Sequence, residues 1–301
     1  MTSSQAPRMD VYSRVTSKII ADLEQGARPW HKPWSASNAS GNIIRPMRAN
    51  GQPYRGVNVL LLWGEADAKG YRSPIWMTYK QAATLGAQVR KGEHGSLVVY
   101  ADKLTKTETD GEGHETERDI RFMKGYTVFN TEQVDGLPAH YYAKAEAPSP
   151  VERIPQAEAF FACTGARVQH GGNRAFYAPH PDFIQMPPAE SFESPESYAA
   201  TKAHELTHWT AHPSRLAREL GKRFGDDAYA AEELIAEMGS AFLCADLGIT
   251  PETRDDHASY LDHWLKVLKA DSRAIFTAAS QAQRAADYLH ELVNSQKQQA
   301  A

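Results

Sequence analysis

The spacing of apolar residues in the first half of the chain predicts short helices and strands joined by polar loops. Between Asp10 and Gly26, apolar residues recur every four positions, at Val11, Val15, Ile19 and Leu23. This period marks one face of a helix, so an amphipathic helix is expected over residues 9–25. The later elements expected in this half are an irregular loop at 27–56, an apolar helix or strand at 57–63, a small helix at 78–85 and strands at 97–100 and 122–129.

Two polar segments interrupt this pattern. Residues 105–119 are dense in Thr, Glu, Asp and Gly, and we expect them to form the exposed, mobile tip of a hairpin. Residues 143–150 have the composition of a linker. A chain of 301 residues is long enough for two domains. We therefore expect an α+β fold with a small mixed domain at 1–145 and a second domain at 151–301.

The second half is expected to be mainly helical. Ser194 is a favourable N-cap and Pro195 a favourable first helical residue, so a helix should begin there and end before Pro213. The other expected elements are helices at 156–164, 228–247, 251–268 and 274–294, and a pair of strands at 175–178 and 183–186.

Charge is distributed unevenly along the chain. The first 100 residues hold 13 Lys and Arg against 6 Asp and Glu, whereas residues 151–301 hold 14 against 21. A basic first third suggests a polyanionic partner, although chance variation over a solvated surface would give the same counts. The hydrophobic fraction of 42% is enough to bury a core in each half.

Cysteine content and the N-terminal sequence bear on the compartment. Two cysteines, Cys163 and Cys244, cannot build a disulfide framework. The first residues lack the apolar core of a signal peptide, and no apolar run is long enough to span a bilayer. We expect a soluble protein of a reducing compartment, with no membrane partner.

The strongest chemical signal is the segment His204-Glu205-Leu206-Thr207-His208. On a helix, two histidines four residues apart project from one face and can bind one metal ion. Glu205 between them can act as the catalytic base that takes a proton from a metal-activated water. The alternative is a polar helix face with two incidental histidines.

A third protein ligand is expected from the helix at 228–247. Glu233 and Glu237 lie four residues apart on one face, and Glu233-x-x-Ala-Glu237 resembles the Glu-x-x-Ala-Asp/Asn element of gluzincin peptidases. That resemblance makes Glu233 the metal ligand and Glu237 the residue that orients a histidine; the reverse assignment stays open. Glu232 is expected to face solvent. His212 is not favoured, because three successive turns of one helix do not converge easily on one ion.

The residue types at this site also bear on the metal and the substrate. Zinc is the default ion for two histidines and one carboxylate, and manganese or cobalt can use the same ligands. The strands at 175–178 and 183–186 could hold an extended peptide by main-chain pairing. Tyr177 could donate to an oxyanion or could be an ordinary buried or surface tyrosine.

The basic first third is also rich in aromatic residues. Cations that track phosphates, together with flat rings on which bases stack, are what single-stranded nucleic acid requires. The alternative is that the tryptophans form the core of a small domain. The candidate DNA-binding residues are Trp30, Lys32, Trp34, Arg45, Arg48, Tyr54, Arg55, Trp76, Lys80, Arg90 and Lys91.

Several segments together resemble ArdC-type antirestriction proteins. They are 29–34, 53–58, 76–81, 86–93 and 126–130 in the first half, and 204–209 and 233–242 in the second. The resemblance runs in the same order from about residue 9 to residue 290 and departs mainly in the acidic stretch 105–119. It implies an N-terminal domain that binds single-stranded DNA and a C-terminal zincin-like, gluzincin-type metallopeptidase domain.

The same resemblance implies a plasmid- or phage-linked protein of the bacterial cytoplasm that protects incoming DNA, such as conjugating plasmid DNA, from host restriction. Two other functions stay open. One is a DNA-tethered metalloprotease that cleaves proteins associated with DNA or with restriction. The other is a pure binding protein with a structural or vestigial metal site.

Overall fold

The N-terminal helices follow from local signals in the sequence. The computed structural model describes residues 10–30, 44–109, 115–142, 150–220, 227–249 and 258–300. Helix α1, Val11–Glu24, is capped by the Asp10 carboxylate, which accepts a hydrogen bond from the Ser13 amide at 2.8 Å. Helix α2, Val57–Lys69, is buried on most of its surface, and helix α3, Tyr79–Thr84, starts with a capping box between Thr78 and Gln81.

The N-terminal strands form one four-stranded sheet and one short pair. The strands are β1 (Met47–Arg48), β2 (Ile75–Met77), β3 (Gln88–Val89), β4 (Ser96–Thr109), β5 (Glu115–Asn130) and β6 (Val134–Asp135). They are arranged in the order β1-β2-β5-β4, with β3 paired to β6. Two 3-10 turns, Thr131–Gln133 and Ala139–Tyr141, complete this half.

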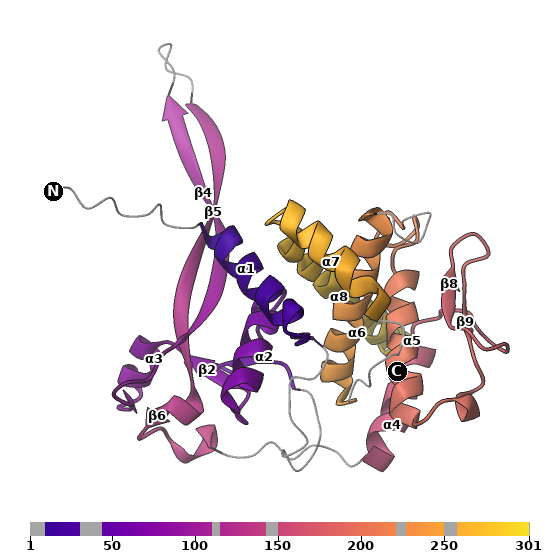
Figure 1. The fold of residues 1–301 in the computed structure, drawn as a ribbon, viewed down its shortest axis with the longest axis horizontal. Helices are drawn as coiled ribbons and strands as arrows, with labels where there is room; N and C mark the ends of the chain where they lie inside the picture. Colours follow the sequence, from indigo (N-terminus) through magenta and orange to yellow (C-terminus); the bar gives the residue numbers. More distant parts are fainter. Residues whose placement is uncertain are drawn as a thin grey trace.

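Strands β4 and β5 are much longer than the sequence pattern predicted. Their antiparallel pairing continues from Ser96↔Val128 to Thr109↔Glu115, and Figure 1 shows the resulting ribbon projecting away from the body of the molecule. The predicted hairpin is present, but the prediction that 105–119 form its tip is wrong at 105–109 and 115–119, which continue the two strands. Residues 110–114 lie outside the described residues. Two paired strands satisfy each other's backbone groups even where the sequence has no alternating apolar face.

The C-terminal half is mainly helical, as expected. Its helices are α4 (Pro150–Ala162), α5 (Pro195–Trp209), α6 (Asp227–Leu247), α7 (Ala258–Ala270) and α8 (Ala274–Ala300). Its strands β7 (Val168–His170), β8 (Phe176–Ala178) and β9 (Phe183–Met186) form a sheet in the order β7-β9-β8, followed by a 3-10 turn at Ala189–Ser191. The expected strand pair is thus β8 and β9, and β7 adds a third strand parallel to β9.

The two halves share a large hydrophobic core, and a smaller separate cluster lies within the N-terminal half. Helix α1 packs against α7 and helix α2 against α8, as Figure 1 shows. The Trp30 ring meets Trp264 edge-on, and the Trp63 ring lies 5.9 Å from Phe242. The mixed α/β fold is confirmed, whereas most of the predicted domain boundary, residues 145–151, lies outside the described residues. None of the described helices is long and apolar enough to cross a membrane.

Candidate metal centre

Most of helix α5 is buried within the protein. Ser194 caps it, accepting a hydrogen bond from the Ser197 amide at 3.0 Å, and Pro195 occupies its first turn. Every residue from Tyr198 to Trp209 is buried. The alanines at 199, 200 and 203 let neighbouring helices approach, so the histidines of this helix lie within the protein rather than on its surface.

Helix α6 approaches α5 at a point where its side chains are smallest. The Ser240 hydroxyl donates to the Ala200 carbonyl at 3.0 Å. A β-carbon added at Gly239 would lie 2.5 Å from Thr207 Cγ2, so only glycine fits there without a shift of either helix. This close contact brings the acidic residues of α6 up to the histidines of α5.

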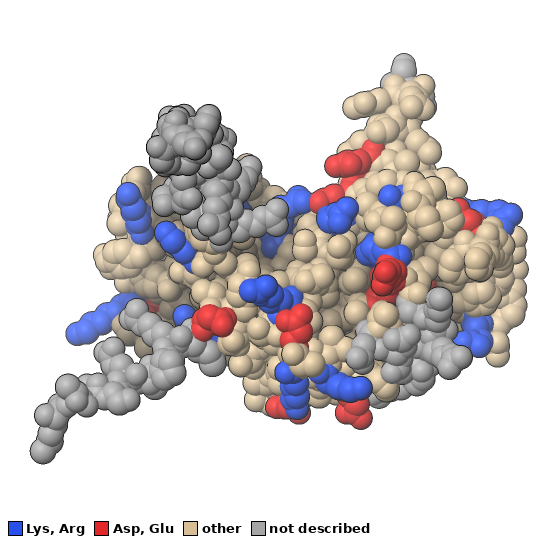
Figure 2. Space-filling view, turned by 90° about the horizontal axis from the view of Figure 1, so that it is seen from above, with Lys and Arg blue, Asp and Glu red and all other residues tan. Residues whose placement is uncertain are grey.

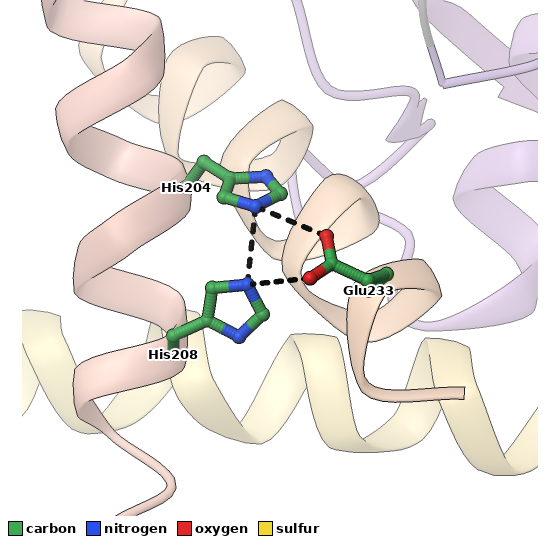
Figure 3. Close-up of side chains that lie close together, drawn as sticks. All are labelled: His204, His208 and Glu233. Carbon is green, nitrogen blue, oxygen red and sulfur yellow. Dashed lines mark hydrogen bonds and ion pairs between the residues drawn. The ribbon is translucent and has the colours of Figure 1, made fainter. Parts of the chain in front are cut away.

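Three side chains converge between the two helices. The Nε2 atoms of His204 and His208 are 3.1 Å apart. The Glu233 carboxylate lies 3.5 Å from His204 Nε2 and 3.7 Å from His208 Nε2, as drawn in Figure 3. Metal–ligand bonds of about 2.0–2.2 Å in a tetrahedral site imply ligand separations of about 3.3–3.6 Å. The three observed separations lie within about 0.2 Å of this range. The side chains therefore fit a divalent ion, and they are all buried.

Each histidine also has a carboxylate behind it. Glu237 Oε1 lies 3.2 Å from His204 Nδ1, and Glu232 Oε1 lies 3.2 Å from His208 Nδ1. The prediction that Glu232 faces solvent is wrong: the residue is 3% exposed. Arg218, from the segment after α5, covers it and binds its carboxylate.

The buried charges shift the ionisation of the site. Burial disfavours the His208 imidazolium, but hydrogen bonds to Glu232 and Glu233 outweigh it and raise the pKa of His208 to about 10. Burial likewise opposes ionisation of Glu233, but hydrogen bonds to His204 and His208 outweigh it and lower the Glu233 pKa. The carboxylate is therefore held in the ionised form that a metal ligand requires.

A cavity of about 470 Å³ opens onto these side chains. His204, Glu205, His208 and Glu233 line it, so the predicted base faces the same space as the predicted ligands. Strand β8, at the edge of its described sheet, also contributes to the wall. The rest of the wall is mixed: it holds the aromatic and apolar side chains of Phe176, Tyr177, Leu220, Tyr229 and Tyr260 and the polar side chains of Asn173, Arg174 and Glu232.

The tyrosines of this wall differ in how they are held. The Tyr177 hydroxyl donates to Asp182 at 2.9 Å and accepts from Arg215 at 3.1 Å, which favours the structural interpretation of this residue. The hydroxyls of Tyr229 and Tyr260 lie 3.2 Å apart. Sequence reasoning missed this pair, although Tyr229 lies four residues before Glu233 on the same helix. Burial, and then hydrogen bonding to Tyr260 and Glu233, raises the pKa of Tyr229. His212, as expected, is not among the cavity residues and bonds to Ser214.

The structure separates the candidate DNA-binding residues into core and surface. Trp30 and Trp76 are each 1% exposed, and Tyr54 and Arg45 are also buried. These four are corrected to core positions, because a base cannot stack on a buried ring and Arg45 binds Asp246 through two hydrogen bonds of 2.9 Å. Lys32 and Trp34 lie outside the described residues.

The other candidates are cations on the surface. Arg48, Lys80 and Lys91 are exposed. Arg55 is exposed but paired with Asp287, and Arg90 is exposed but paired with Glu93 and Asp135. Figure 2 shows Lys and Arg side chains spread over the viewed face with Asp and Glu among them. That face therefore carries no uninterrupted basic stripe in the described residues.

Comparison with known proteins finds two families that match different parts of the chain. Residues 9–129 match the N-terminal domain of anti-restriction factor ArdC, and residues 155–281 match a zincin-like metallopeptidase family. An uncharacterized Sinorhizobium fredii protein, y4eC, is 45% identical over 96% of this chain and 95% of its own length. DNA primase TraC of Escherichia coli is 40% identical over 95% of this chain, which spans only 27% of that protein.

Two crystal structures of the antirestriction protein ArdC from plasmid R388 are also similar. The metal-free structure has 46% identity and a TM-score of 0.80, over 95% of this chain and 99% of that one. The Mn(II)-bound structure has 47% identity and a TM-score of 0.76, over 95% of this chain and 98% of that one. On this evidence, the chain belongs to the ArdC family of antirestriction proteins and combines the ArdC N-terminal domain with a zincin-like metallopeptidase domain.

Proposed function

We propose that this chain binds single-stranded DNA, protects incoming plasmid DNA from restriction, and carries a metal-dependent peptidase centre. The observation that supports the peptidase centre is the convergence of His204, His208 and Glu233 at a cavity that Glu205 also lines. A purely structural metal site would be closed by four protein ligands. Here three side chains converge beside an open cavity, which leaves room for water and a substrate.

The residues of the cavity have distinct roles in this proposal. An ion held by His204, His208 and Glu233 would act as a Lewis acid and make water nucleophilic at neutral pH. Zinc is the resident ion that we propose for this ligand set. Glu205 would accept a proton and return it to the leaving amine. The edge of β8 that is unpaired among the described strands would pair with an extended peptide. A hydroxyl of the Tyr229–Tyr260 pair, which lines the same cavity, would donate to the carbonyl oxygen.

The test of the peptidase centre is Glu205→Gln in the full-length chain. This change removes the proposed base and leaves the three ligands in place, so metal content should match the unaltered protein. We expect protection of transferred plasmid DNA in a conjugation assay to fall about 100-fold or more, the usual loss for a missing general base. Full protection with normal metal content would show that hydrolysis is not required, and the chain would then act as a binding protein.

The exposed residues of the N-terminal half support a DNA surface near α3 and β3. Tyr79 is 52% exposed, and its hydroxyl accepts a hydrogen bond from Gln88 at 2.9 Å. Its ring therefore lies beside β3, and the turn after this strand carries Arg90 and Lys91. Lys80 follows Tyr79 in the chain and is exposed. An accessible ring with three nearby cations is the arrangement that single-stranded DNA requires.

Fluorescence polarisation with a labelled oligothymidine tests this surface. We expect Tyr79→Ala combined with Lys80→Ala to weaken binding about fivefold or more, because each stacked base contributes about 1–3 kcal/mol. Affinity should fall with salt at a log–log slope of about −0.7 per phosphate contacted. Tyr100→Ala is the matched control, since this ring is 49% exposed but lies on β4. Loss of binding in the control alone would place the DNA surface elsewhere.

A further inference from the structure

The two histidines of the metal cluster are supported in different ways. Glu237 lies behind His204, and it is the residue that the gluzincin resemblance predicts to orient a histidine. Behind His208 lies Glu232, the neighbour of the proposed ligand Glu233. A histidine that donates its Nδ1 proton to a carboxylate keeps its Nε2 lone pair free for a metal. His208 Nε2 does point at the cluster, 3.1 Å from His204 Nε2.

Glu232 requires a partner, because a buried carboxylate is costly unless it is neutralised and hydrogen-bonded. Arg218 supplies both. Its Nε donates to Oε2 at 3.0 Å and its Nη2 to Oε1 at 2.8 Å, and both side chains are about 95% buried. This paired geometry depends on the planar guanidinium, which a lysine cannot reproduce.

The same guanidinium also binds the end of helix α5. Arg218 Nη2 donates to the Thr207 carbonyl at 2.7 Å, and Nη1 donates to the Thr210 hydroxyl at 2.8 Å. Thr207 and Thr210 flank His208 in the sequence. One side chain therefore fixes both the carboxylate that contacts His208 and the helical turn from which His208 projects.

The residue before Arg218 has an unusual backbone conformation, which turns the Arg218 side chain toward the protein interior. Ala217 has a φ of +50°, a left-handed conformation that is unfavourable for a residue with a β-carbon. The chain is held there by hydrogen bonds from the Leu216 amide to the Thr210 carbonyl and from the Arg218 amide to the Ala211 carbonyl, both 3.0 Å. A strained conformation persists only where its surroundings determine it strongly.

We infer that Arg218 and Glu232 are positioning residues that set the affinity of the centre for its metal by orienting His208. This inference rests on the proposed function, since it takes His204, His208 and Glu233 as the ligands. The Glu232 carboxylate lies within hydrogen-bonding distance of His208 Nδ1, and Arg218 fixes the position of that carboxylate through its two hydrogen bonds. Because the two charges cancel, the pair orients the ligand without adding net charge next to the ion.

The experiment measures the Kd for Mn(II), and for Zn(II) by chelator competition, in the full-length chain. We expect Glu232→Gln and Arg218→Lys each to weaken metal binding about 10–100-fold, the usual effect of losing a group that orients a metal-bound histidine. Thermal unfolding without metal, measured in parallel, separates a loss of affinity from a loss of fold.

Asp182→Asn is the matched control for a merely structural effect. It breaks the neighbouring pair with Arg215, whose Nη1 lies 3.0 Å from Asp182, and that pair does not contact either histidine. We expect the control to keep the metal Kd within about twofold of the unaltered protein. If Asp182→Asn weakened metal binding as much as Glu232→Gln, the inference would be overturned. Loss of any ion pair made by the segment after α5 would then have the same effect on the metal Kd.

The remaining outcomes are also decisive. Folded Glu232→Gln and Arg218→Lys variants with an unchanged Kd would overturn the inference while leaving the metal centre intact. If Glu232→Gln does not fold, the Kd of Arg218→Lys decides alone. The proposed function itself fails if the unaltered protein binds no metal, or if the His208→Ala variant binds metal as tightly as the unaltered protein. The inference then fails with it.

Discussion

The contact between Gly239 and Thr207 makes the packing of the metal centre directly testable. In Gly239→Ala the new β-carbon would lie 2.5 Å from Thr207 Cγ2 and 2.8 Å from Oγ1. Thr207 cannot move aside easily, because it is fully buried and its hydroxyl donates to the Ala203 carbonyl at 2.9 Å. Helices α5 and α6 would have to separate by about 0.9 Å to reach an ordinary contact of 3.4 Å.

The expected loss of stability follows from two opposing effects. Overpacking a tight core costs about 1–3 kcal/mol. Alanine in place of glycine in a helix returns about 1 kcal/mol. We therefore expect a net loss of up to about 2 kcal/mol in the free energy of unfolding, measured by urea denaturation. Metal affinity should also fall at least about tenfold, because a metal site tolerates changes in ligand distance of only about 0.2 Å.

Two further variants test whether the close contact between Gly239 and Thr207 causes the loss of stability. Gly64→Ala makes the same change inside helix α2, where the new β-carbon would meet only ordinary contacts, the nearest being Asp22 Oδ2 at 3.5 Å. It should stabilise the protein by up to about 1 kcal/mol. Combining Gly239→Ala with Thr207→Ala should restore part of the lost stability, because the two nearest atoms are then absent. A Gly239→Ala protein that gains as much stability as Gly64→Ala would show that the close contact has no steric cost.

Two other predictions concern the shared core. Trp76→Ala should cost about 3–5 kcal/mol of unfolding free energy in urea, because the ring is 1% exposed; a loss under 1 kcal/mol would contradict its place in the core. Burial raises the Asp246 pKa, but His290 and Arg45 outweigh it and lower the pKa. The stability that this carboxylate contributes is thus present above its unfolded pKa, near 4, and is lost as the pH falls through the lower folded value. Asp246→Asn leaves the buried Arg45 guanidinium without its carboxylate, so it should cost about 1–2 kcal/mol at pH 7 and flatten the acid side of the stability curve between pH 2 and 5; an unchanged curve would contradict it.

The elements predicted best from the sequence are those with local determinants. Helix α1 follows its four-residue apolar spacing and its Asp10 cap, and helix α5 follows Ser194 and Pro195. The two histidines lie on one face because helix geometry alone places them there. These features depend on residues within a few positions of each other, so the sequence pattern contains nearly all the information needed.

The features that were missed depend on distant parts of the chain. Glu232 and Glu233 are both buried, and the burial of Glu232 depends on Arg218, which comes from a loop with no periodic pattern. Trp30 and Trp76 occur in a basic segment, but composition cannot distinguish a stacking ring from a core ring. The helices α7 and α8, more than 180 residues later, contribute to burying the first half.

The central claim is that His204, His208 and Glu233 bind one divalent ion that Glu205 does not ligate. The most direct test is metal content after reconstitution with Mn(II) or Zn(II) and desalting, measured by elemental analysis on the full-length chain. We expect about one ion per chain in the unaltered protein and in Glu205→Gln, and an almost complete loss in His204→Ala, His208→Ala and Glu233→Ala. Full occupancy in any of the three alanine variants, or loss in Glu205→Gln, would contradict the claim.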